Sequence, residues 1–567
     1  MSYIIQFKYR YIFWMAYLFM PLLSFAQSAY LLPDNLTTYQ LTRLEIKQDS
    51  IASPHLFNTS SGFYRRKEIT EFVENYNVSG IKLSKQDYFN MRYILNDNFE
   101  YTQSNTLSKK PILLKQAYKY KSALFGVKND EFSLAINPIL YMFAGKEQGN
   151  ANTVYLDSRG VEMRARIGKN VGIYTTLQNE IFTPFNRVKS YYDQYSVIPG
   201  EAFLKTKDTI TFNYFRANGY LTVKLNKYFD VQFGHGNNVL GNGYRSFYMS
   251  SVSRPHLFAR INTHIWKINY TNIYGSLYQY APFGNGRNNA QVKRTHFATQ
   301  YLNYNIIKNV SIGFFQTVLF YRDSNFQQQG FDPEYLNPII FMKAVENGLN
   351  SPDKAIIGAD FKWNFLNHFS LYGQMVIAEF VLGNFGTGWV NNKYAVQAGI
   401  KYIDAFGINN LDLQYEYNYA RPYMYTSFDN QNSYVNWNTP GAHILGANFI
   451  ENIGIIRYQP LERLQLKASA FIYKIGLDTN GSNWGQDISK TYRSPPKQYD
   501  NYAGQGVTTN VIFTDFVASY MLFHNFFIDL NINYRSSESI LPPLFTAKGW
   551  MIGMGVRWNM NERRWDY

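Results

Sequence analysis

Hydrophobic and polar residues alternate with a period of two over most of the chain, from about residue 131 onward. The clearest segment sets apolar or aromatic residues against polar ones: Leu411, Leu413, Tyr415, Tyr417 and Tyr419 alternate with Asp412, Gln414, Glu416 and Asn418. The segments 357–364, 526–535 and 550–559 follow the same pattern. Successive side chains of a strand point to opposite faces, so the pattern predicts strands with one face in an apolar medium and the other in a polar medium.

A soluble β-sandwich would show the same alternation, so the lengths of the connections decide between the two folds. Tight turns are expected near 168–170, 225–228, 263–265, 306–309, 365–368, 403–409, 459–462 and 522–525. Long connections are expected near 182–210, 236–256, 281–293, 322–355, 420–443, 475–506 and 536–548. This alternation of short and long connections predicts an all-β fold, a transmembrane antiparallel β-barrel of about 18 strands of roughly ten residues each.

The region before the barrel has a helical pattern. Ile69, Phe72 and Val73 fall at helical spacing, and Ser84 followed by Asp87 resembles a capping box. The sequence therefore predicts a small helical hairpin in this region, packed under the main domain.

Three regions follow from these patterns. Residues 27–110 are expected to form a partly helical N-terminal region, and residues 111–567 the barrel with its long extracellular loops. An even number of strands leaves both ends of the barrel on one side of the membrane, which predicts a periplasmic N-terminal region. The chain closes on Trp565, Asp566 and Tyr567, and a terminal aromatic residue beside the last strand suits the aromatic girdle and outer-membrane assembly.

Residues 1–26 resemble a secretory signal peptide. A basic start with Lys8 and Arg10 precedes an apolar stretch, and the small residues Ser24 and Ala26 precede the expected cleavage site. The alternative is a single anchoring helix, but the stretch is short and contains Pro21. No cysteine follows, which excludes lipoprotein anchoring.

Composition agrees with a barrel and excludes several other classes. The 567 residues include no cysteine, which excludes disulfide scaffolds, cysteine-ligated zinc sites and cysteine nucleophiles. Aromatic residues make up 18%, and interfacial girdles of a barrel account for most of them. The mean hydropathy of −0.32 excludes a polytopic helical membrane protein. The net charge of +15 suits an acidic envelope surface, or it is spread evenly and steers nothing.

The sequence shows no strong enzymatic signature. Its eight histidines include no HExxH pattern, so no metal, cofactor or nucleic-acid partner is expected. Ser246, Ser250 and Ser251 share one long loop with His256, which leaves a lipid or glycan hydrolase as the least favoured hypothesis.

Aromatic residues in the predicted outer loops are candidates for contact with sugars. Their rings can stack on the C–H faces of sugars while nearby polar groups bond the hydroxyls. The alternative is that several belong to the outer girdle or pack a loop plug. The candidates are Tyr335, Trp389, Tyr423, Tyr425, Trp437 and Trp484.

Three parts of the chain resemble the RemB and Wzi group of outer-membrane proteins. They are Gly241–Ser246 with the segment 258–280, the run from Tyr335 through Ser351–Asp353 into Ile356, and Arg65–Glu68 with Lys82–Asn98. The resemblance implies an eighteen-stranded outer-membrane barrel with a periplasmic helical part. Wzi proteins help to attach capsular polysaccharide, and RemB is a surface-exposed gliding-motility protein of the Bacteroidetes, whose gliding machinery is linked to type IX secretion.

The residues and the resemblance together suggest a non-enzymatic protein of the cell outer membrane with surface-exposed loops. The favoured function is to bind or scaffold surface polysaccharide, in capsule attachment or in gliding motility and adhesion. The alternative is a diffusion porin or channel, because the strand number is porin-like. Expected partners are outer-membrane lipid and lipopolysaccharide, capsular or exopolysaccharide, and gliding or type IX secretion components.

Overall fold

The structure is a computed structural model, and it describes residues 29–31, 36–53, 55–102, 120–201, 210–282, 290–321, 323–324, 327–328, 331–342, 353–479, 481–539 and 548–566. The expected signal peptide at residues 1–26 and the expected boundary at residues 110–111 lie outside these ranges. Both therefore stay predictions.

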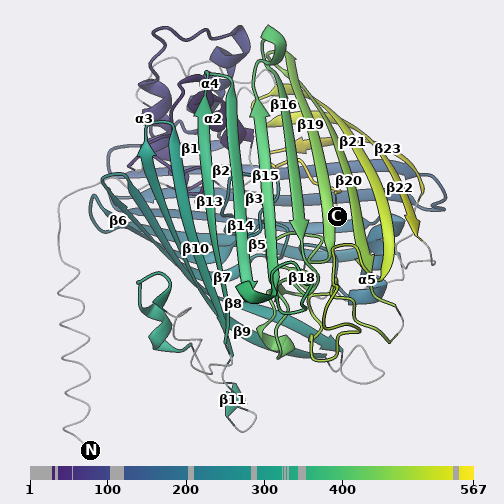
Figure 1. Ribbon diagram of the computed structural model, residues 1–567. Coiled ribbons are helices and arrows are strands. Elements are labelled where there is room, and N and C mark those ends of the chain that lie inside the picture. The colour runs from purple at the N-terminus through teal and green to yellow at the C-terminus, as the bar shows by residue number, and fades with distance from the viewer. Residues whose placement is uncertain are drawn as a thin grey trace, which may run out of the picture.

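Eighteen antiparallel strands form a closed barrel, as the alternation predicts (Figure 1). Its first and last strands close the ring, with Leu140 opposite Trp558. A short strand, β1 (Phe125–Lys128), adds to the first half of β2. The barrel strands are β2 (Phe132–Glu147), β3 (Thr153–Ile167), β4 (Val171–Thr183), β5 (Phe212–Lys224), β6 (Phe229–Gly236), β7 (His256–Ile265), β8 (Ile268–Pro282), β9 (Ala290–Ile307), β10 (Val310–Phe320), β13 (Lys354–Phe365), β14 (Phe369–Glu379), β15 (Lys393–Tyr402), β16 (Leu411–Ala420), β19 (Phe449–Leu461), β20 (Leu464–Leu477), β21 (Val507–Phe523), β22 (Phe526–Ser539) and β23 (Lys548–Trp558).

Apolar residues cover the outer face of the barrel, whereas the inner face carries polar residues together with buried aromatic residues such as Phe143. In β16 the polar residues Asp412 and Glu416 are buried, whereas Tyr415 between them is 50% exposed. In β23 the outward residues Ile552 and Met554 are 54% and 61% exposed. This arrangement inverts that of a soluble protein and leaves an apolar outer wall, as a lipid environment requires.

The two rims differ in the length of their connections. One rim carries tight turns such as 168–170, 225–228 and 524–525, close to the predicted positions. The turn expected at 263–265 lies instead at residues 266–267, because β7 continues to Ile265 and Trp266 takes a left-handed conformation with φ of 54°. The other rim carries the long connections.

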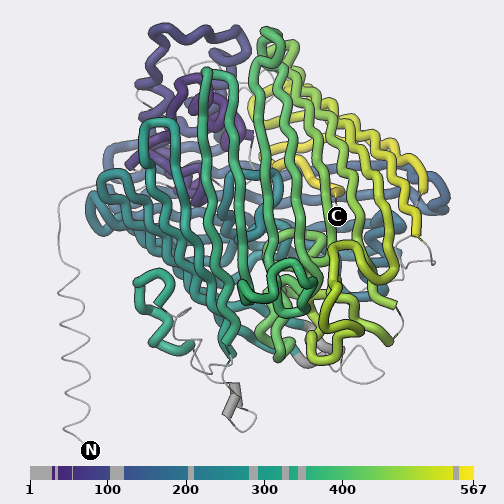
Figure 2. The backbone as a smooth tube through the Cα atoms, viewed as in Figure 1, coloured from purple at the N-terminus to yellow at the C-terminus, as the bar shows by residue number. Residues whose placement is uncertain are grey.

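Helices lie at both rims. The predicted hairpin is confirmed as α3 (Arg66–Glu74) and α4 (Lys85–Asp97), and Ser84 forms a capping box with Asp87. Two further helices, α2 (Leu36–Lys47) and α5 (Asn186–Tyr195), were not predicted. Figures 1 and 2 show α2, α3 and α4 gathered at the rim of short turns. Among the residues that the structure describes, no helix has both the length and the apolar character needed to cross a membrane.

The segment after the last strand corrects one prediction. Trp565 does not join an outer girdle, because its ring lies 6.0 Å from that of Phe143 and 5.9 Å from that of Phe182, and both phenylalanines are inward-facing and buried. Residues 559–566 therefore turn into the lumen. Figure 2 marks this end of the chain within the outline of the barrel.

Candidate functional site

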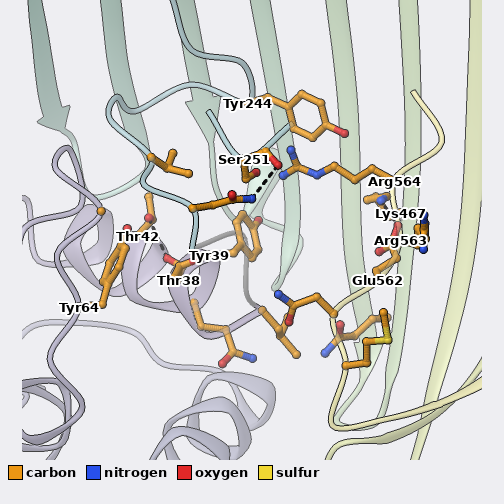
Figure 3. A pocket seen from close by; sticks show the side chains of 18 of the residues that line it. Thr38, Tyr39, Thr42, Tyr64, Tyr244, Ser251, Lys467, Glu562, Arg563 and Arg564 are labelled. Atoms are coloured by element: carbon orange, nitrogen blue, oxygen red, sulfur yellow. Dashed lines mark hydrogen bonds and ion pairs between the residues drawn. The ribbon is translucent and has the colours of Figure 1, made fainter. Parts of the chain in front are cut away.

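A cavity of about 610 Å³ lies in the lumen of the barrel (Figure 3). The parts of the chain that line it include helices α2 and α4, residues 59–66, the loop 237–255, inward-facing residues of the strands, and the segment 559–566. In Figure 3, Tyr39 and Thr42 of α2 lie across from Tyr244 and Arg564. The cavity therefore depends on regions that are far apart in the sequence.

The loop 237–255 enters the lumen because two glycines allow a close approach to the wall. Gly241 has φ of 122°, and a Cβ atom there would lie 2.2 Å from Gln374 Nε2. A Cβ atom on Gly243 would lie 2.6 Å from Gln397 Oε1. These glycines begin the sequence Gly241–Ser246, which carries part of the family resemblance.

Glu416 of β16 anchors this loop to the wall. Its carboxylate accepts hydrogen bonds from the backbone N–H groups of Tyr244, at 2.6 Å, and Arg245, at 3.0 Å. It also accepts from the Tyr372 hydroxyl at 2.8 Å. Because this carboxylate is fully buried, its several donors compensate for the loss of hydration.

Ion pairs anchor helix α2 on the opposite side of the cavity. The Arg43 guanidinium contacts Asp87 at 3.2 Å and Asp404 at 3.0 Å, and it also pairs with Asp412. Lys362 of β13 pairs with Glu45 of α2 at 2.5 Å. Burial alone would raise the pKa of Asp87, but the Arg43 and Lys47 cations lower it to about 2.

The segment 559–566 is anchored by side chains. Glu562 pairs with Lys467 of β20, and Arg563 pairs with Glu180 of β4 at 2.7 Å. The Asp566 carboxylate accepts a hydrogen bond from the Tyr244 hydroxyl at 2.7 Å and contacts Arg245 at 3.0 Å.

Cations outnumber carboxylates among the residues that line the cavity. Several of these cations form ion pairs with carboxylates, as Arg557 does with Asp529 at 2.6 Å. The formal charge of the lining is therefore positive. The basic lining residues are Arg43, Arg66, Arg164, Arg216, Arg245, Lys362, Lys401, Arg457, Lys467, Arg557, Arg563 and Arg564, and the acidic ones are Asp97, Glu162, Asp412, Glu562 and Asp566.

The candidate loop aromatics fall into two groups. Tyr335, Tyr423 and Tyr425 are buried. The Tyr425 hydroxyl donates to the carbonyl of Phe247 at 2.8 Å, and the Tyr335 ring stacks on Phe320 with centroids 4.1 Å apart. The other three, Trp389, Trp437 and Trp484, are partly exposed.

The structure brings only some of these candidates together. Tyr423 lies beside Trp484, because its backbone N–H donates to Gly485 O at 2.8 Å. Tyr335 packs in a separate cluster with Phe320 and Val318. Sugar contact by the six residues stays a prediction.

The cavity residues were not predicted as a site. Inward-facing charged residues such as Lys401 and Arg457 occur at the polar positions of the alternation, where any barrel has polar residues. The one available signal was the pair of glycines in Gly241–Ser246, which marks a close backbone approach.

The serine and histidine arrangement that a hydrolase needs is not formed in the loop 237–255. Neither ring nitrogen of His256 has a hydrogen-bond partner among the described residues. The Ser246 hydroxyl donates a hydrogen bond to the carbonyl oxygen of Leu240, and the Ser250 hydroxyl donates one to the carbonyl oxygen of Ala442 at 2.5 Å.

No protein-family model matches the sequence, and no curated protein does so either. Among solved structures, Wzi of Escherichia coli aligns with 94% of this chain and 100% of its own chain, with a TM-score of 0.57 and 12% identity. This chain has the fold of Wzi. Wzi is an outer-membrane protein involved in group 1 capsule assembly and a carbohydrate-binding β-barrel.

Two other barrels match less of the chain. OccAB2 of Acinetobacter baumannii and OprD of Pseudomonas aeruginosa cover 76% and 75% of it and 98% and 94% of their own chains, with 9% and 8% identity and TM-scores of 0.43 and 0.41. The outward apolar wall and the fold shared with Wzi support an outer-membrane location. No comparison bears on the RemB or Bacteroidetes side of the resemblance, which stays a prediction.

Proposed function

We propose that this protein is a non-enzymatic outer-membrane barrel that binds or scaffolds surface polysaccharide. The observation that carries the proposal is the cavity inside a barrel with the Wzi fold, because its lining combines cationic groups with many hydrogen-bonding side chains. Sugars present hydroxyl and carboxylate groups that such side chains bind.

Binding of the purified protein to the capsule or exopolysaccharide of its own cell tests the proposal. Saturable binding is expected, and Arg457→Met should weaken it. Arg457 donates to Gln414 at 3.0 Å, and no carboxylate of the described residues pairs with it. Lys146→Met is the matched control, because Lys146 is exposed and does not line the cavity. Absence of saturable binding contradicts the proposal.

The three partly exposed tryptophans extend the proposal to the long-loop rim. Trp437 stacks on Tyr278 with centroids 5.7 Å apart, and the Arg254 guanidinium lies 5.3 Å from its ring. Trp389→Ala, Trp437→Ala and Trp484→Ala should each weaken glycan binding if these rings stack on sugar.

The cellular role that we propose is capsule attachment, or gliding motility and adhesion of a Bacteroidetes cell, with lipopolysaccharide and gliding or type IX secretion components as possible neighbours in the membrane. A deletion strain separates these roles. Loss of retained capsule supports the first, and loss of spreading supports the second.

The alternative function is a diffusion pore. The position of the cavity in the lumen is the observation that favours this alternative. Conductance across a planar bilayer distinguishes the two. A large steady current supports a pore, whereas a closed barrel supports the binding protein. Helix α2, the loop 237–255 and the segment 559–566 line the cavity in the lumen and favour the latter.

A further inference from the structure

Residues 559–566 occupy the lumen with few backbone contacts. Asn559 takes a left-handed conformation with φ of 53°, and its N–H donates to Asn525 O at 3.0 Å. This is the one hydrogen bond between the backbone of this segment and another backbone group of the described residues. Side chains therefore hold the rest of the segment in place.

Trp565 fills an aromatic pocket on the wall. Its ring centroid lies 6.0 Å from Phe143, 5.9 Å from Phe182 and 4.7 Å from Phe185, and the side chain is 7% exposed. Its indole N–H has no hydrogen-bond partner among the described residues. The pocket thus fits a ring but leaves a polar group of its occupant unsatisfied.

Asp566, which follows Trp565, forms an ion pair with Arg245. Asp566 contacts Arg245 at 3.0 Å and accepts from the Tyr244 hydroxyl at 2.7 Å. A second Arg245 nitrogen donates to the backbone carbonyl of Asp566 at 2.9 Å. Burial alone would raise the pKa of the Asp566 carboxyl. The Arg245 and Arg564 cations nevertheless hold this pKa below its usual range.

Successive residues of one segment thus place a ring in a phenylalanine pocket and a carboxylate on an arginine, and this pair of contacts matches the chemistry of an acidic glycan. The phenylalanine rings can stack on the C–H face of a sugar while the guanidinium pairs with the carboxylate of a uronic acid. We infer that the phenylalanine pocket together with Tyr244 and Arg245 forms a subsite for a short stretch of acidic glycan whose uronic acid pairs with Arg245. Trp565 and Asp566 occupy this subsite until the glycan displaces the segment 559–566.

This inference rests on the proposed function, because it names the class of glycan and its place. It also predicts a length dependence. The tethered Trp565 and Asp566 compete at a high effective concentration, so a single uronic acid competes poorly. An oligomer that also contacts cavity cations such as Lys401 and Arg457 competes better.

The chain has no cysteine, so one introduced thiol reports the position of the segment. Asn561→Cys lies in the segment and lines the cavity, and Lys146→Cys is an exposed control outside it. Oligogalacturonate should accelerate maleimide labelling of Asn561→Cys and leave Lys146→Cys unchanged. A neutral oligosaccharide of equal length, a galacturonic acid monomer and inorganic phosphate should have little effect.

Three outcomes overturn the inference. These are unchanged labelling with oligogalacturonate, equal acceleration by the neutral oligosaccharide, and equal acceleration by phosphate, which would indicate a general anion site. Binding of the cell's own polysaccharide with unchanged labelling rejects the displacement alone. Absence of any polysaccharide binding rejects the proposed function itself.

Substitutions separate the subsite from its occupant. Trp565→Ala and Asp566→Asn should raise labelling without ligand and tighten oligogalacturonate binding by about tenfold, because they weaken a tethered competitor. Arg245→Met should also raise labelling but weaken oligogalacturonate binding. Opposite effects on binding support the subsite, whereas weaker binding by all three variants contradicts it. Heat-modifiable mobility on gels checks that each variant forms the barrel.

Discussion

At the residue scale, Arg43 shows how buried ion pairs hold helix α2 against the barrel. Its guanidinium contacts carboxylates from α4, from the turn before β16, and from β16 itself. Its side chain is 5% exposed, so all of these charges are withdrawn from bulk water. A buried charge without its partner is costly, which makes this residue a sensitive point.

Replacing Arg43 by methionine should loosen the N-terminal helices. Removing one partner of a buried ion pair costs about 3–5 kcal/mol, because the remaining charge is left uncompensated. Limited proteolysis of the purified barrel should then cleave the region 36–97 faster. The control is Lys67→Met, since the Lys67–Glu71 pair in the same region is exposed and worth little. Equal protection of Arg43→Met and the native protein contradicts the prediction.

Gly241 should tolerate no side chain. An alanine there must adopt φ of 122° and place its Cβ atom 2.2 Å from Gln374 Nε2. Such overpacking typically costs about 1–3 kcal/mol, so Gly241→Ala should lower the thermal unfolding midpoint and weaken glycan binding. Gly454→Ala is the matched control, because nothing lies within 4 Å of a Cβ atom at that strand position. Equal midpoints for the two variants would show that the loop adapts without strain.

At the scale of elements, the strands and the helices α3 and α4 could be predicted, but α2 and α5 could not. Helix α3 buries Ile69 and Val73 at helical spacing, and α4 begins with a recognisable capping box. Helix α2 instead buries charged residues such as Arg43, Glu45 and Lys47 against the polar wall of the lumen. Because α2 also buries Leu41, Leu44 and Ile46, its buried face mixes apolar and charged residues, and the spacing of apolar residues alone does not identify it.

The same physics limits prediction of the candidate site. Polar residues occupy many inward positions of the strands, so the sequence does not distinguish Lys401 of the cavity from an ordinary lumen residue. Exposed loops suggested Tyr423 and Tyr425 instead, but these rings are buried in packed loops. The residues that line the cavity are identified only by contacts between distant parts of the chain, such as the ion pair of Asp566 with Arg245, and the sequence alone does not show these contacts.

The N-terminal helices should detach in acid. The pKa of Asp87 is lowered to about 2 in the folded protein, against an unfolded value of about 3.9. A lowered pKa stabilises docking above the unfolded value, and this contribution is lost as the pH falls from about 3.9 through about 2. Pepsin, which is active in acid, should cleave the region 36–97 increasingly over that interval. In Asp87→Asn this dependence should become shallower but persist in part, because the same two cations also lower the pKa of Asp404.

At the scale of the whole molecule, the eighteen barrel strands of the described residues form a closed ring, and segments enter the lumen from both rims. The helices enter from the rim of short turns, and long loops such as 420–448 pack buried residues including Tyr425 and Tyr434. Closure satisfies the strand hydrogen bonds that lipid cannot. A filled lumen also means that function depends on which rim faces the cell exterior.

We expect the long loops to face outward and the N-terminal helices to face the periplasm, as in barrels with short periplasmic turns. The cysteine-free chain allows a direct measurement with a membrane-impermeant maleimide on intact cells. Phe428→Cys lies in a long loop and is 58% exposed, and Tyr88→Cys lies on α4 and is 51% exposed. Phe428→Cys should be labelled on intact cells, and Tyr88→Cys only after the outer membrane is permeabilised. The reverse pattern would place the long loops in the periplasm, where they could not meet a capsule, and would remove the basis for a surface role.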